Sequence, residues 1–343
     1  MKYFENTYCS KPFGDFEISP DGMVHVCCPS YLKQPIGNAF EIEIDTLLSS
    51  NPLKMIHESM VEQDYRFCSW TECPAIREKL GSFEENLSED MFELSEDMFE
   101  YNVKDVRLSY DPSCNLWCPS CRGEKCIVRG EQRDKVMDIT FKTVIPLLKS
   151  AKSLVMNGYG DIFAARSCRA IMEELSSKNA PKLQYDFITN AVLFSEDNWN
   201  KYHNLHDMVN SIRVSIDASK KETYDKVRLG GDWEKLMTNL KFISRLRKNG
   251  VIKNFMISFV VQYENYLEVV DFAKFGIKLG CDQIIFENIM DWNVLERPDF
   301  LMQAVHYPDH LNHKKYIDIM QKLAEIKPQD MLVGSAINDI KER

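Results

Sequence analysis

Apolar positions along the chain follow two different periods. From Asp105 to Phe286, short apolar runs typical of buried strands alternate with segments in which apolar residues recur every three or four positions, as in amphipathic helices. The predicted strands are Val106 to Tyr110, Ser153 to Asn157, Leu183 to Thr189, Ser211 to Ile216, Phe255 to Val261 and Gln283 to Phe286. Strands that alternate with helices indicate a parallel α/β sheet with right-handed crossovers, and six of them predict a partial (β/α)6 barrel.

Two of the intervening helices have clear ends. Trp233 to Lys248 stops before Asn249-Gly250, and Asn265 to Leu279 stops before Gly280. Glycine directly after the last apolar position is a common helix terminator. Ligands of such folds bind at the carboxyl ends of the strands, so polar residues that follow a strand are the first candidates for a site.

The first 81 residues have another pattern. Phe16 to Val26 alternates apolar and polar residues around Pro20-Asp21-Gly22, which predicts a β-hairpin. A helix is predicted from about Ile44 to Val61, because apolar residues gather on one side of it. This small segment also holds five of the eleven cysteines: Cys9, Cys27, Cys28, Cys68 and Cys73.

An acidic repeat separates the cysteine-rich segment from the alternating region. The unit LSEDMFE occurs twice between Leu87 and Glu100, which fits an amphipathic acidic helix but is too short for a coiled coil. The predicted domains are a cysteine-rich module at 1–81, an acidic linker at 82–104, the barrel at 105–292 and a C-terminal helical extension at 293–343. Three histidines of the extension are interpreted as helix surface rather than metal ligands: His306, His310 and His313.

Composition narrows the class of protein. Hydrophobic residues at 44% and charged residues at 27% are ordinary for a globular chain. A formal net charge of −10 argues against a broad nucleic-acid surface. The N-terminus lacks the apolar segment of a secretory signal, and no apolar stretch approaches the roughly 18 residues that span a bilayer. We therefore expect a cytoplasmic protein that binds neither nucleic acid nor membrane.

Three cysteines follow the first barrel strand at CxxxCxxC spacing: Cys114, Cys118 and Cys121. Eleven cysteines in a reducing compartment favour metal ligation over disulfides. Three thiolates can hold an iron–sulfur cluster and leave its fourth iron open to a small ligand. A zinc site would need a fourth ligand, for which Cys126 is the only local candidate. Buried thiols that pack as small apolar side chains are a further alternative.

The strand followed by CNLWCPSC resembles the radical S-adenosylmethionine (radical SAM) superfamily. In that family the open iron binds S-adenosylmethionine, and the reduced cluster cleaves it to a 5'-deoxyadenosyl radical that takes a hydrogen atom from substrate. The resemblance implies a 4Fe–4S cluster on Cys114, Cys118 and Cys121, S-adenosylmethionine, and an electron donor such as flavodoxin or ferredoxin. Family members usually carry an aromatic residue before the last cysteine, where this chain has Ser120.

The cysteine-rich module is similar to the SPASM/twitch auxiliary-cluster extensions of the same family. CSKPF, PDG, the paired cysteines, IGN and CSWTEC carry this resemblance. It implies one auxiliary 4Fe–4S cluster on Cys9, Cys27, Cys68 and Cys73, with Cys28 as the alternate to Cys27. In most members the module follows the barrel, whereas here it precedes it. A zinc ribbon is the alternative interpretation of a cysteine-bearing hairpin.

Motifs at strand ends are similar to the family's contacts with S-adenosylmethionine. NGYGDIF resembles the GGE-type motif for the methionyl amino group, and it contributes Gly158, Gly160 and Asp161. Ser215 and Asp217 resemble the ribose-contacting pair, and Arg228 would pair with the methionyl carboxylate. The alternatives are helix caps for the two aspartates and a surface position for the arginine. Thr189-Asn190 resembles a pair common at the third strand end.

Substrate residues are expected beyond the last strand. The candidates are Glu287, Asn288, Asp291 and Trp292. Cys126 is the candidate hydrogen donor, and Cys168 and Cys281 are interpreted as structural. GxSxG, HExxH and GxxxxGK[ST] are absent from the sequence, so hydrolase and phosphate-loop functions lose their usual support.

The expected function is radical SAM oxidation or epimerisation of a carbohydrate or other small polyol, because the module order departs from that of the peptide modifiers. The auxiliary cluster would accept one electron from the substrate radical or bind the substrate. A maturase that modifies a ribosomal peptide or protein is the alternative. A zinc-stabilised binding protein without enzymatic activity is the alternative from another class.

Overall fold

The computed structural model describes residues 7–78, 83–85, 103–326 and 328–337. The predicted acidic linker helix lies outside these described residues. The chain divides into two compact units. The first unit comprises residues 1–111, 129–159 and 174–184, and the second comprises residues 112–128, 160–173 and 185–343. The domain limits expected from the sequence stay predictions.

The sheet of the first unit joins the N-terminal hairpin to the first barrel strand. Its strands, in spatial order, are β7 (Ser153–Met156), β6 (Asp105–Leu108), β2 (Asp15–Ile18), β3 (Met23–His25) and β4 (Gly37–Asn38). The predicted hairpin is confirmed, since β2 and β3 pair antiparallel. β2 also pairs parallel with β6, so the hairpin extends the sheet edge beside the first barrel strand. A separate pair is formed by β1 (Thr7–Cys9) and β5 (Phe83–Glu85).

The helix predicted from Ile44 to Val61 is two helices, α1 (Ile44–Leu48) and α2 (Asn51–Val61). Ser50 caps α2, because its hydroxyl accepts a hydrogen bond from the Leu53 N–H at 3.4 Å. Pro52 lies in the first turn of α2 and has no N–H to continue a helix from α1. The remaining helices of this unit are α3 (Pro74–Glu78), α5 (Gly130–Ile139) and α6 (Ile145–Leu148), with short helical turns at Lys11–Phe13 and Thr140–Val144.

The second unit contains parallel strands in the order β8 (Gln184–Thr189), β9 (Val209–Ser215), β10 (Asn254–Val261), β11 (Gln283–Asn288) and β12 (Leu332–Val333). Its helices are α7 (Arg166–Glu174), α8 (Glu196–Lys201), α9 (Lys221–Val227), α10 (Trp233–Lys248), α11 (Val269–Leu279), α12 (Arg297–Gln303) and α13 (His313–Ala324). Short helical turns lie at His203–Met208, Tyr266–Glu268 and Gln329–Met331. All six predicted strands are present, and the predicted α/β class of a partial barrel is confirmed. The two-residue strand β12 was not predicted.

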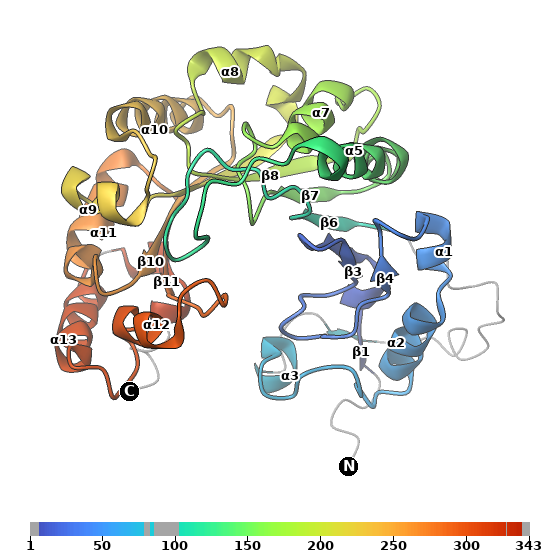
Figure 1. Ribbon diagram of the computed structural model, residues 1–343, viewed down its shortest axis with the longest axis horizontal. Helices are drawn as coiled ribbons and strands as arrows, with labels where there is room; N and C mark the ends of the chain where they lie inside the picture. Colours follow the sequence, from blue (N-terminus) through green and yellow to red (C-terminus); the bar gives the residue numbers. More distant parts are fainter. Residues whose placement is uncertain (1–6, 79–82, 86–102, 327, 338–343) are drawn as a thin grey trace. The chain divides into compact units, whose positions relative to one another are not determined.

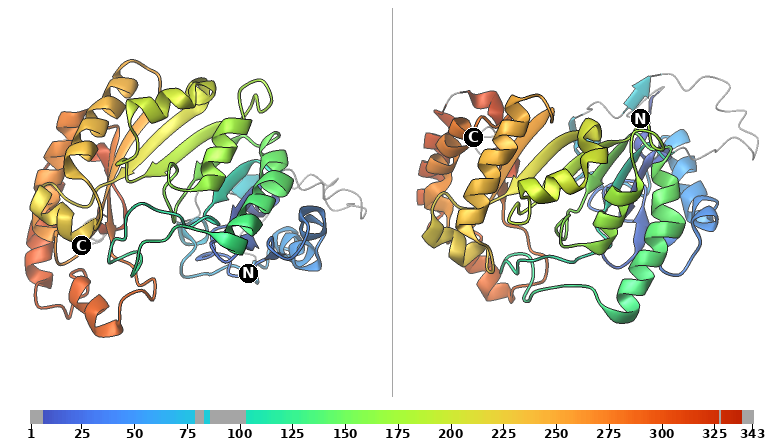
Figure 2. Two further views of the ribbon diagram at one scale, coloured as in Figure 1. Left: turned by 45° about the horizontal axis from the view of Figure 1, so that its top comes forward. Right: turned by 90° about the horizontal axis from the view of Figure 1, so that it is seen from above.

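Helices cover one face of this sheet, and several polar residues lie on the other. α10 and α11 run along the same side of β10 and β11 (Figures 1 and 2). On that side the Phe272 ring of α11 lies 4.8 Å from Phe259 and 5.9 Å from Phe286. Because side chains alternate along a strand, the neighbouring residues Ser258 and Glu287 face the opposite side. The candidate site is therefore built on the face that the helices leave open.

The three histidines of the extension do not share a helix surface. His306 and His310 lie in the turn between α12 and α13, and only His313 begins a helix. The prediction was wrong for the first two because apolar spacing in this stretch does not separate a tight turn from a helix. The His310 ring instead bonds the Met302 carbonyl through Nε2 at 3.0 Å. No helix in the described part of the chain is both long and apolar enough to cross a bilayer.

Candidate functional site

The three cysteines at CxxxCxxC spacing gather in one loop of the second unit. Cys114 and Cys118 are buried, Cys121 is partly buried, and all three pack with Leu116 and Val192. The Cys114 N–H donates to the Cys126 carbonyl at 2.8 Å, which closes the loop. The backbone of Cys126 therefore supports the cysteine loop, while its predicted role as a hydrogen donor stays a prediction.

Each of the three sulfurs faces a side-chain N–H donor. Asn190 Nδ2 lies 3.7 Å from Cys114 Sγ. Arg228 Nη1 lies 3.6 Å from Cys118 Sγ, and Arg122 Nη2 lies 3.6 Å from Cys121 Sγ. Hydrogen bonds and positive charge both favour the thiolate form that iron requires. Three thiols with matched donors fit an iron–sulfur cluster.

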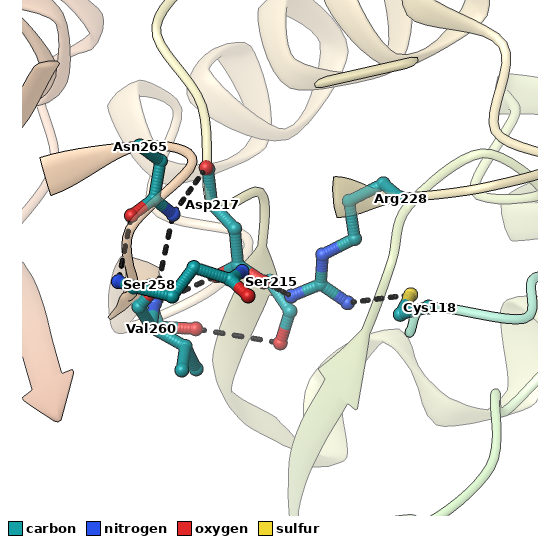
Figure 3. A network of polar contacts seen from close by, with 8 residues as sticks. Cys118, Ser215, Asp217, Arg228, Ser258, Val260 and Asn265 are labelled. Atoms are coloured by element: carbon teal, nitrogen blue, oxygen red, sulfur yellow. Dashed lines mark hydrogen bonds and ion pairs between the residues drawn. The ribbon is translucent and has the colours of Figure 1, made fainter. Parts of the chain in front are cut away.

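Arg228 is held by a buried aspartate (Figure 3). Its Nη2 lies 2.7 Å from Asp217 Oδ2, and the side chains are only 13% and 2% exposed. Asp217 is fixed in turn, because its Oδ1 accepts a hydrogen bond from the Val260 N–H at 2.8 Å and its carbonyl accepts one from Asn265 Nδ2 at 2.9 Å. Burial excludes the alternative of a surface arginine. Arg228 instead links the end of β9 to Cys118.

Burial sets the proton affinities of the site. It raises the pKa of the Cys114 thiol to about 11, with a smaller contribution from the Asp161 charge. It also raises the pKa of Cys118, against the opposing charge of Arg228. Burial alone would lower the pKa of Arg228, but the charges of Asp217 and Cys118 outweigh it and raise that pKa. The thiols therefore carry protons at neutral pH, and a bound metal must displace them.

Asp161 ties the cysteine loop to the end of β8. Its carboxylate is fully buried and accepts hydrogen bonds from Thr189 Oγ1 at 2.7 Å and from the Asn190 N–H at 3.0 Å. Its own N–H donates to the Ser113 carbonyl at 2.9 Å. The Thr189-Asn190 pair thus orients Asp161 on one side and Cys114 on the other. Contact of Asp161 with a methionyl amino group stays a prediction.

The two glycines of NGYGDIF fall in different compact units. Gly158 belongs to the first unit, where an added Cβ would lie 3.3 Å from Ser109 Oγ. Gly160 belongs to the second unit with Asp161. Asn157, directly before this pair, has a left-handed backbone with φ of 71°. Non-glycine residues seldom adopt that conformation, and it marks this strand end as a constrained turn.

A glycine turn clamps Arg228 against the cysteine loop. The Trp117 N–H donates to the Leu229 carbonyl at 3.0 Å. Gly230 has φ of 80°, and a Cβ there would lie 2.2 Å from the Trp117 ring. The close approach of backbone and ring requires glycine at this position.

The substrate candidates separate into two groups. Glu287 lies on the open sheet face and its Oε2 accepts a hydrogen bond from the Ser335 N–H at 3.0 Å. Asn288 Oδ1 accepts one from the Tyr316 hydroxyl at 3.0 Å. Asp291 pairs with Arg297 at 3.0 Å, and Trp292 is 61% exposed. The first two therefore belong to the end of β11, whereas the last two lie on the exposed loop beyond it.

Four cysteines of the first unit line one cavity of about 180 Å³: Cys9, Cys27, Cys68 and Cys73. Most of the remaining wall is apolar, including Leu32, Met60 and Ile76. Burial, with smaller contributions from the nearby charges of Cys9 and Cys73, raises the pKa of Cys68 to about 12. The donor set fits a four-iron cluster held by four thiolates. Cys28 does not line this cavity, whereas Cys27 lines both it and the neighbouring pocket that contains Cys28, and the choice of Cys27 as the ligand stays a prediction.

Several residues of these sites have no motif in the sequence. Arg122 and Asn265 act through hydrogen bonds to the cysteine loop and to Asp217. Arg122 does follow Cys121 directly, which is the only sequence signal it has. Within the described ranges, no three Cys, His, Asp or Glu side chains already stand close enough to hold a single metal ion.

Residues 9–74 match the family model of the SPASM iron–sulfur cluster-binding domain. Among curated proteins, no sequence matches the chain. The match covers the segment that contains the four-cysteine cavity and the predicted hairpin. It confirms the module expected from the sequence.

Three solved structures illustrate the similarity of fold. TYW1 with a lysine-pyruvate adduct is 12% identical, with 65% of this chain and 71% of that chain covered and a TM-score of 0.40. Native anSMEcpe with bound AdoMet is 22% identical, with 64% and 58% covered and a TM-score of 0.45. Streptococcus suis SuiB bound to the precursor peptide SuiA is 11% identical, with 98% and 74% covered and a TM-score of 0.48.

The SPASM match agrees with the predicted auxiliary iron–sulfur cluster, and S-adenosylmethionine stays a prediction. The chain spans 58% of anSMEcpe and 74% of SuiB. The chain thus carries a segment, residues 9–74, that is similar to the SPASM iron–sulfur cluster-binding domain, as its sequence predicts.

Proposed function

We propose that this radical SAM-type chain removes a hydrogen atom from a carbon of its substrate. The observation that carries the proposal is the cysteine loop, in which three sulfurs each face their own N–H donor. When bound there, a reduced cluster with S-adenosylmethionine supplies the 5'-deoxyadenosyl radical. The reaction that follows, oxidation or epimerisation, is part of the proposal, as is the assignment of individual residues.

The residues of the chain would orient the cofactors and exclude water. Cys114, Cys118 and Cys121 would hold three corners of the cluster, and Asn190, Arg122 and Arg228 would fix their sulfurs. Ser215 lies on the open sheet face, and its hydroxyl is 3.3 Å from that of Ser258. These hydroxyls can bind a polyol or ribose without breaking a structural ion pair.

The four-cysteine cavity would hold the auxiliary cluster. Its apolar lining keeps water away from the sulfurs, and the exposure of a cluster helps to set its potential. Lys11 lies in the same wall, and the charges of Cys27 and Cys9 contribute to the raised pKa of its ammonium group. It can therefore offset part of the negative charge of bound thiolates. A cluster held by these four cysteines would supply an acceptor for one electron from the substrate radical, or a site that binds the substrate.

Cysteine variants of the anaerobically purified protein test the two assignments separately. We expect about eight irons per chain in the wild type, from two four-iron clusters. Cys118→Ala should lose half of the iron and all formation of 5'-deoxyadenosine. Cys73→Ala should also lose half of the iron but keep some cleavage without product. Cys168→Ala is the matched control, because it removes a buried thiol outside both sites and should keep iron and activity.

Retained 5'-deoxyadenosine formation in Cys118→Ala would overturn the ligand assignment. Two zincs per chain instead of iron would support the non-enzymatic binding protein. For the substrate, deuterated sugars and polyols are screened beside deuterated peptides, and label in 5'-deoxyadenosine identifies the class. Label from sugars supports the carbohydrate proposal, and label from peptides alone supports the maturase alternative.

A further inference from the structure

Arg213 is a partly buried cation without a bonded partner. It lies in β9, two residues before Ser215 on the same face of the strand. Its Nε is fully buried and makes no hydrogen bond, and no described residue forms an ion pair with its guanidinium. An arginine keeps its charge at any physiological pH, so this face carries a fixed positive charge.

The nearest carboxylates are already engaged. Asp217 pairs with Arg228 at 2.7 Å, and Glu287 accepts a hydrogen bond from the Ser335 N–H at 3.0 Å. Both influence Arg213 electrostatically, and burial together with the Arg228 charge opposes them. The groups that face Arg213 therefore orient and polarise it without filling its donors.

Another arginine of the same unit has hydrogen-bond partners for its guanidinium. Arg247 donates to both oxygens of Asp282, through Nε at 2.7 Å and Nη2 at 2.8 Å. Removing a charged group from water without such a partner costs several kcal/mol. A fold that gives Arg247 a full bidentate partner but leaves Arg213 without one therefore reserves Arg213 for an external acceptor.

The surroundings define what that acceptor is. Ser258 pairs with Ser215 and Met256 pairs with Arg213 in the β9–β10 register, so two hydroxyls lie two residues further along the same open face as Arg213. A planar guanidinium with hydroxyls on the same face suits a carboxylate or another oxyanion. Arg213 also lies about 7 Å along the strand from Ser215, away from the turn that contacts the cysteine loop.

We propose that Arg213 binds an oxyanion of the ligand that enters over this sheet face, and that the substrate supplies it. The substrate class becomes a molecule with a carboxylate, sulfate or phosphate group, with Glu287 beside it for a hydroxyl or ammonium. The assignment to substrate rests on the proposed function. The binding of an oxyanion does not, because it requires no turnover.

Inorganic sulfate is the probe for the site. The thermal midpoint of the anaerobic holoenzyme is measured in sodium sulfate and in sodium chloride of equal ionic strength. We expect a saturable rise with sulfate in the wild type that Arg213→Gln loses, because a ligand that binds only the folded state stabilises it. Arg245→Gln removes an exposed arginine charge of the same unit and should keep the rise. Arg213→Lys keeps the positive charge but not the planar guanidinium, and it should retain part of the rise with sulfate.

A second measurement tells whether the substrate or S-adenosylmethionine carries the oxyanion that Arg213 binds. Dissociation constants of S-adenosylmethionine and of decarboxylated S-adenosylmethionine are compared by equilibrium dialysis. If the substrate supplies the oxyanion, Arg213→Gln changes both constants by less than about twofold. A loss of about tenfold for S-adenosylmethionine alone would reassign Arg213 to the methionyl carboxylate.

An equal sulfate response in all variants, with unchanged affinity for both nucleosides, would overturn the proposal. Loss of folding does not confuse the test, since Arg213→Gln removes a charge with no ion pair and should unfold in chloride at no lower temperature than the wild type. If sulfate raises the thermal midpoint but the protein never forms 5'-deoxyadenosine, the proposed function is wrong and the oxyanion site is still supported.

Discussion

At the scale of single residues, two arginines place a positive charge beside cysteine sulfurs: Arg122 at Cys121 and Arg228 at Cys118. Arg122 Nη1 donates to the Pro112 carbonyl at 2.7 Å, which aims Nη2 at Cys121 Sγ. Reduction adds a negative charge to a cluster, and a nearby cation stabilises that state. The arginines at Cys118 and Cys121 would therefore act on the potential of a cluster bound there as well as on its attachment.

Replacing Arg122 should lower the reduction potential of the cluster on the cysteine loop. Arg122→Gln removes the cation beside Cys121, so the more negative reduced state loses stabilisation and the midpoint moves to more negative values. Arg122→Lys keeps the charge and should shift less, while Arg245→Gln should not shift at all. Redox titration followed by electron paramagnetic resonance measures the midpoint. A midpoint in Arg122→Gln equal to that of the wild type would contradict this role.

Sequence motifs predict residues that repeat a family pattern and miss those that depend on contacts in the folded structure. The CxxxCxxC spacing and the positions of Asp217 and Arg228 were predictable, because each lies in a stretch of sequence that resembles a family motif. Their mutual ion pair was not, since each was expected to contact a cofactor. Arg213 was missed because only the folded structure shows that its Nε is buried and lacks a hydrogen-bond partner.

At the scale of elements, short turns and caps decide where helices and functional loops lie. The break between α1 and α2 depends on Ser50 and Pro52. The prediction of a single helix relied on apolar spacing and did not take these two residues into account. The long helix α10 was predicted with both ends correct, because Asp232 caps its start and Asn249-Gly250 follows its end. Local chemistry thus predicts an element well when cap and apolar period agree.

Gly230→Ala should detach Arg228 from Cys118. The new methyl group would overlap the Trp117 ring, whereas a Cβ at Gly250 meets no atom within 4 Å. Both glycines have left-handed backbones, with φ of 80° and 72°, so Gly250→Ala is a control with the same backbone cost of about 1 kcal/mol. We expect Gly230→Ala to lose iron from one cluster and to unfold at a lower temperature than Gly250→Ala. Equal iron contents in the two variants would refute the clamp.

His57 should make the first unit sensitive to acid. Burial in α2 lowers its pKa to about 4 from the usual 6.5, and its Nε2 donates to the Pro12 carbonyl at 2.9 Å. The unfolded chain binds this proton more readily, so the contribution to stability is complete above about pH 6.5 and is lost as pH falls toward 4. Between about pH 7.5 and 5.5 the loss is about 1 kcal/mol.

Urea unfolding of the wild type and of His57→Gln at the two pH values isolates this contribution. The variant lacks the titrating ring, so its free energy of unfolding should fall less between the two values than that of the wild type. Parallel pH dependences of the two proteins would show that His57 does not titrate differently in the folded state.

At the scale of the whole molecule, the two cysteine sites are built in separate compact units. The four-cysteine cavity belongs to the first unit and the cysteine loop to the second. The alternation of strands and helices was predictable, because the strand positions that face the helices are apolar, as Phe259 and Phe286 are. β12 was not, because two residues, Leu332 and Val333, are too few to form a recognisable run.

Both sites should couple metal loading to global stability in the same pH direction. The pKa of Cys114 is raised to about 11 and that of Cys68 to about 12, mainly by burial, so the metal-free protein holds these thiols protonated. Cluster binding releases the protons, and its affinity therefore falls as pH falls. A ligand that binds only the folded chain raises its midpoint of thermal unfolding, so the gap between loaded and metal-free protein should narrow at lower pH.

Calorimetry of the loaded and chelator-treated wild type at about pH 8 and pH 6.5 measures that gap. Each site can be followed alone, in Cys118→Ala for the four-cysteine cavity and in Cys73→Ala for the cysteine loop. Because the pKa of Cys68 is raised in one site and that of Cys114 in the other, each variant should retain part of the pH-dependent gap. A gap that widens toward acid would mean that protons do not compete with the metal, and the thiols could not then be its ligands.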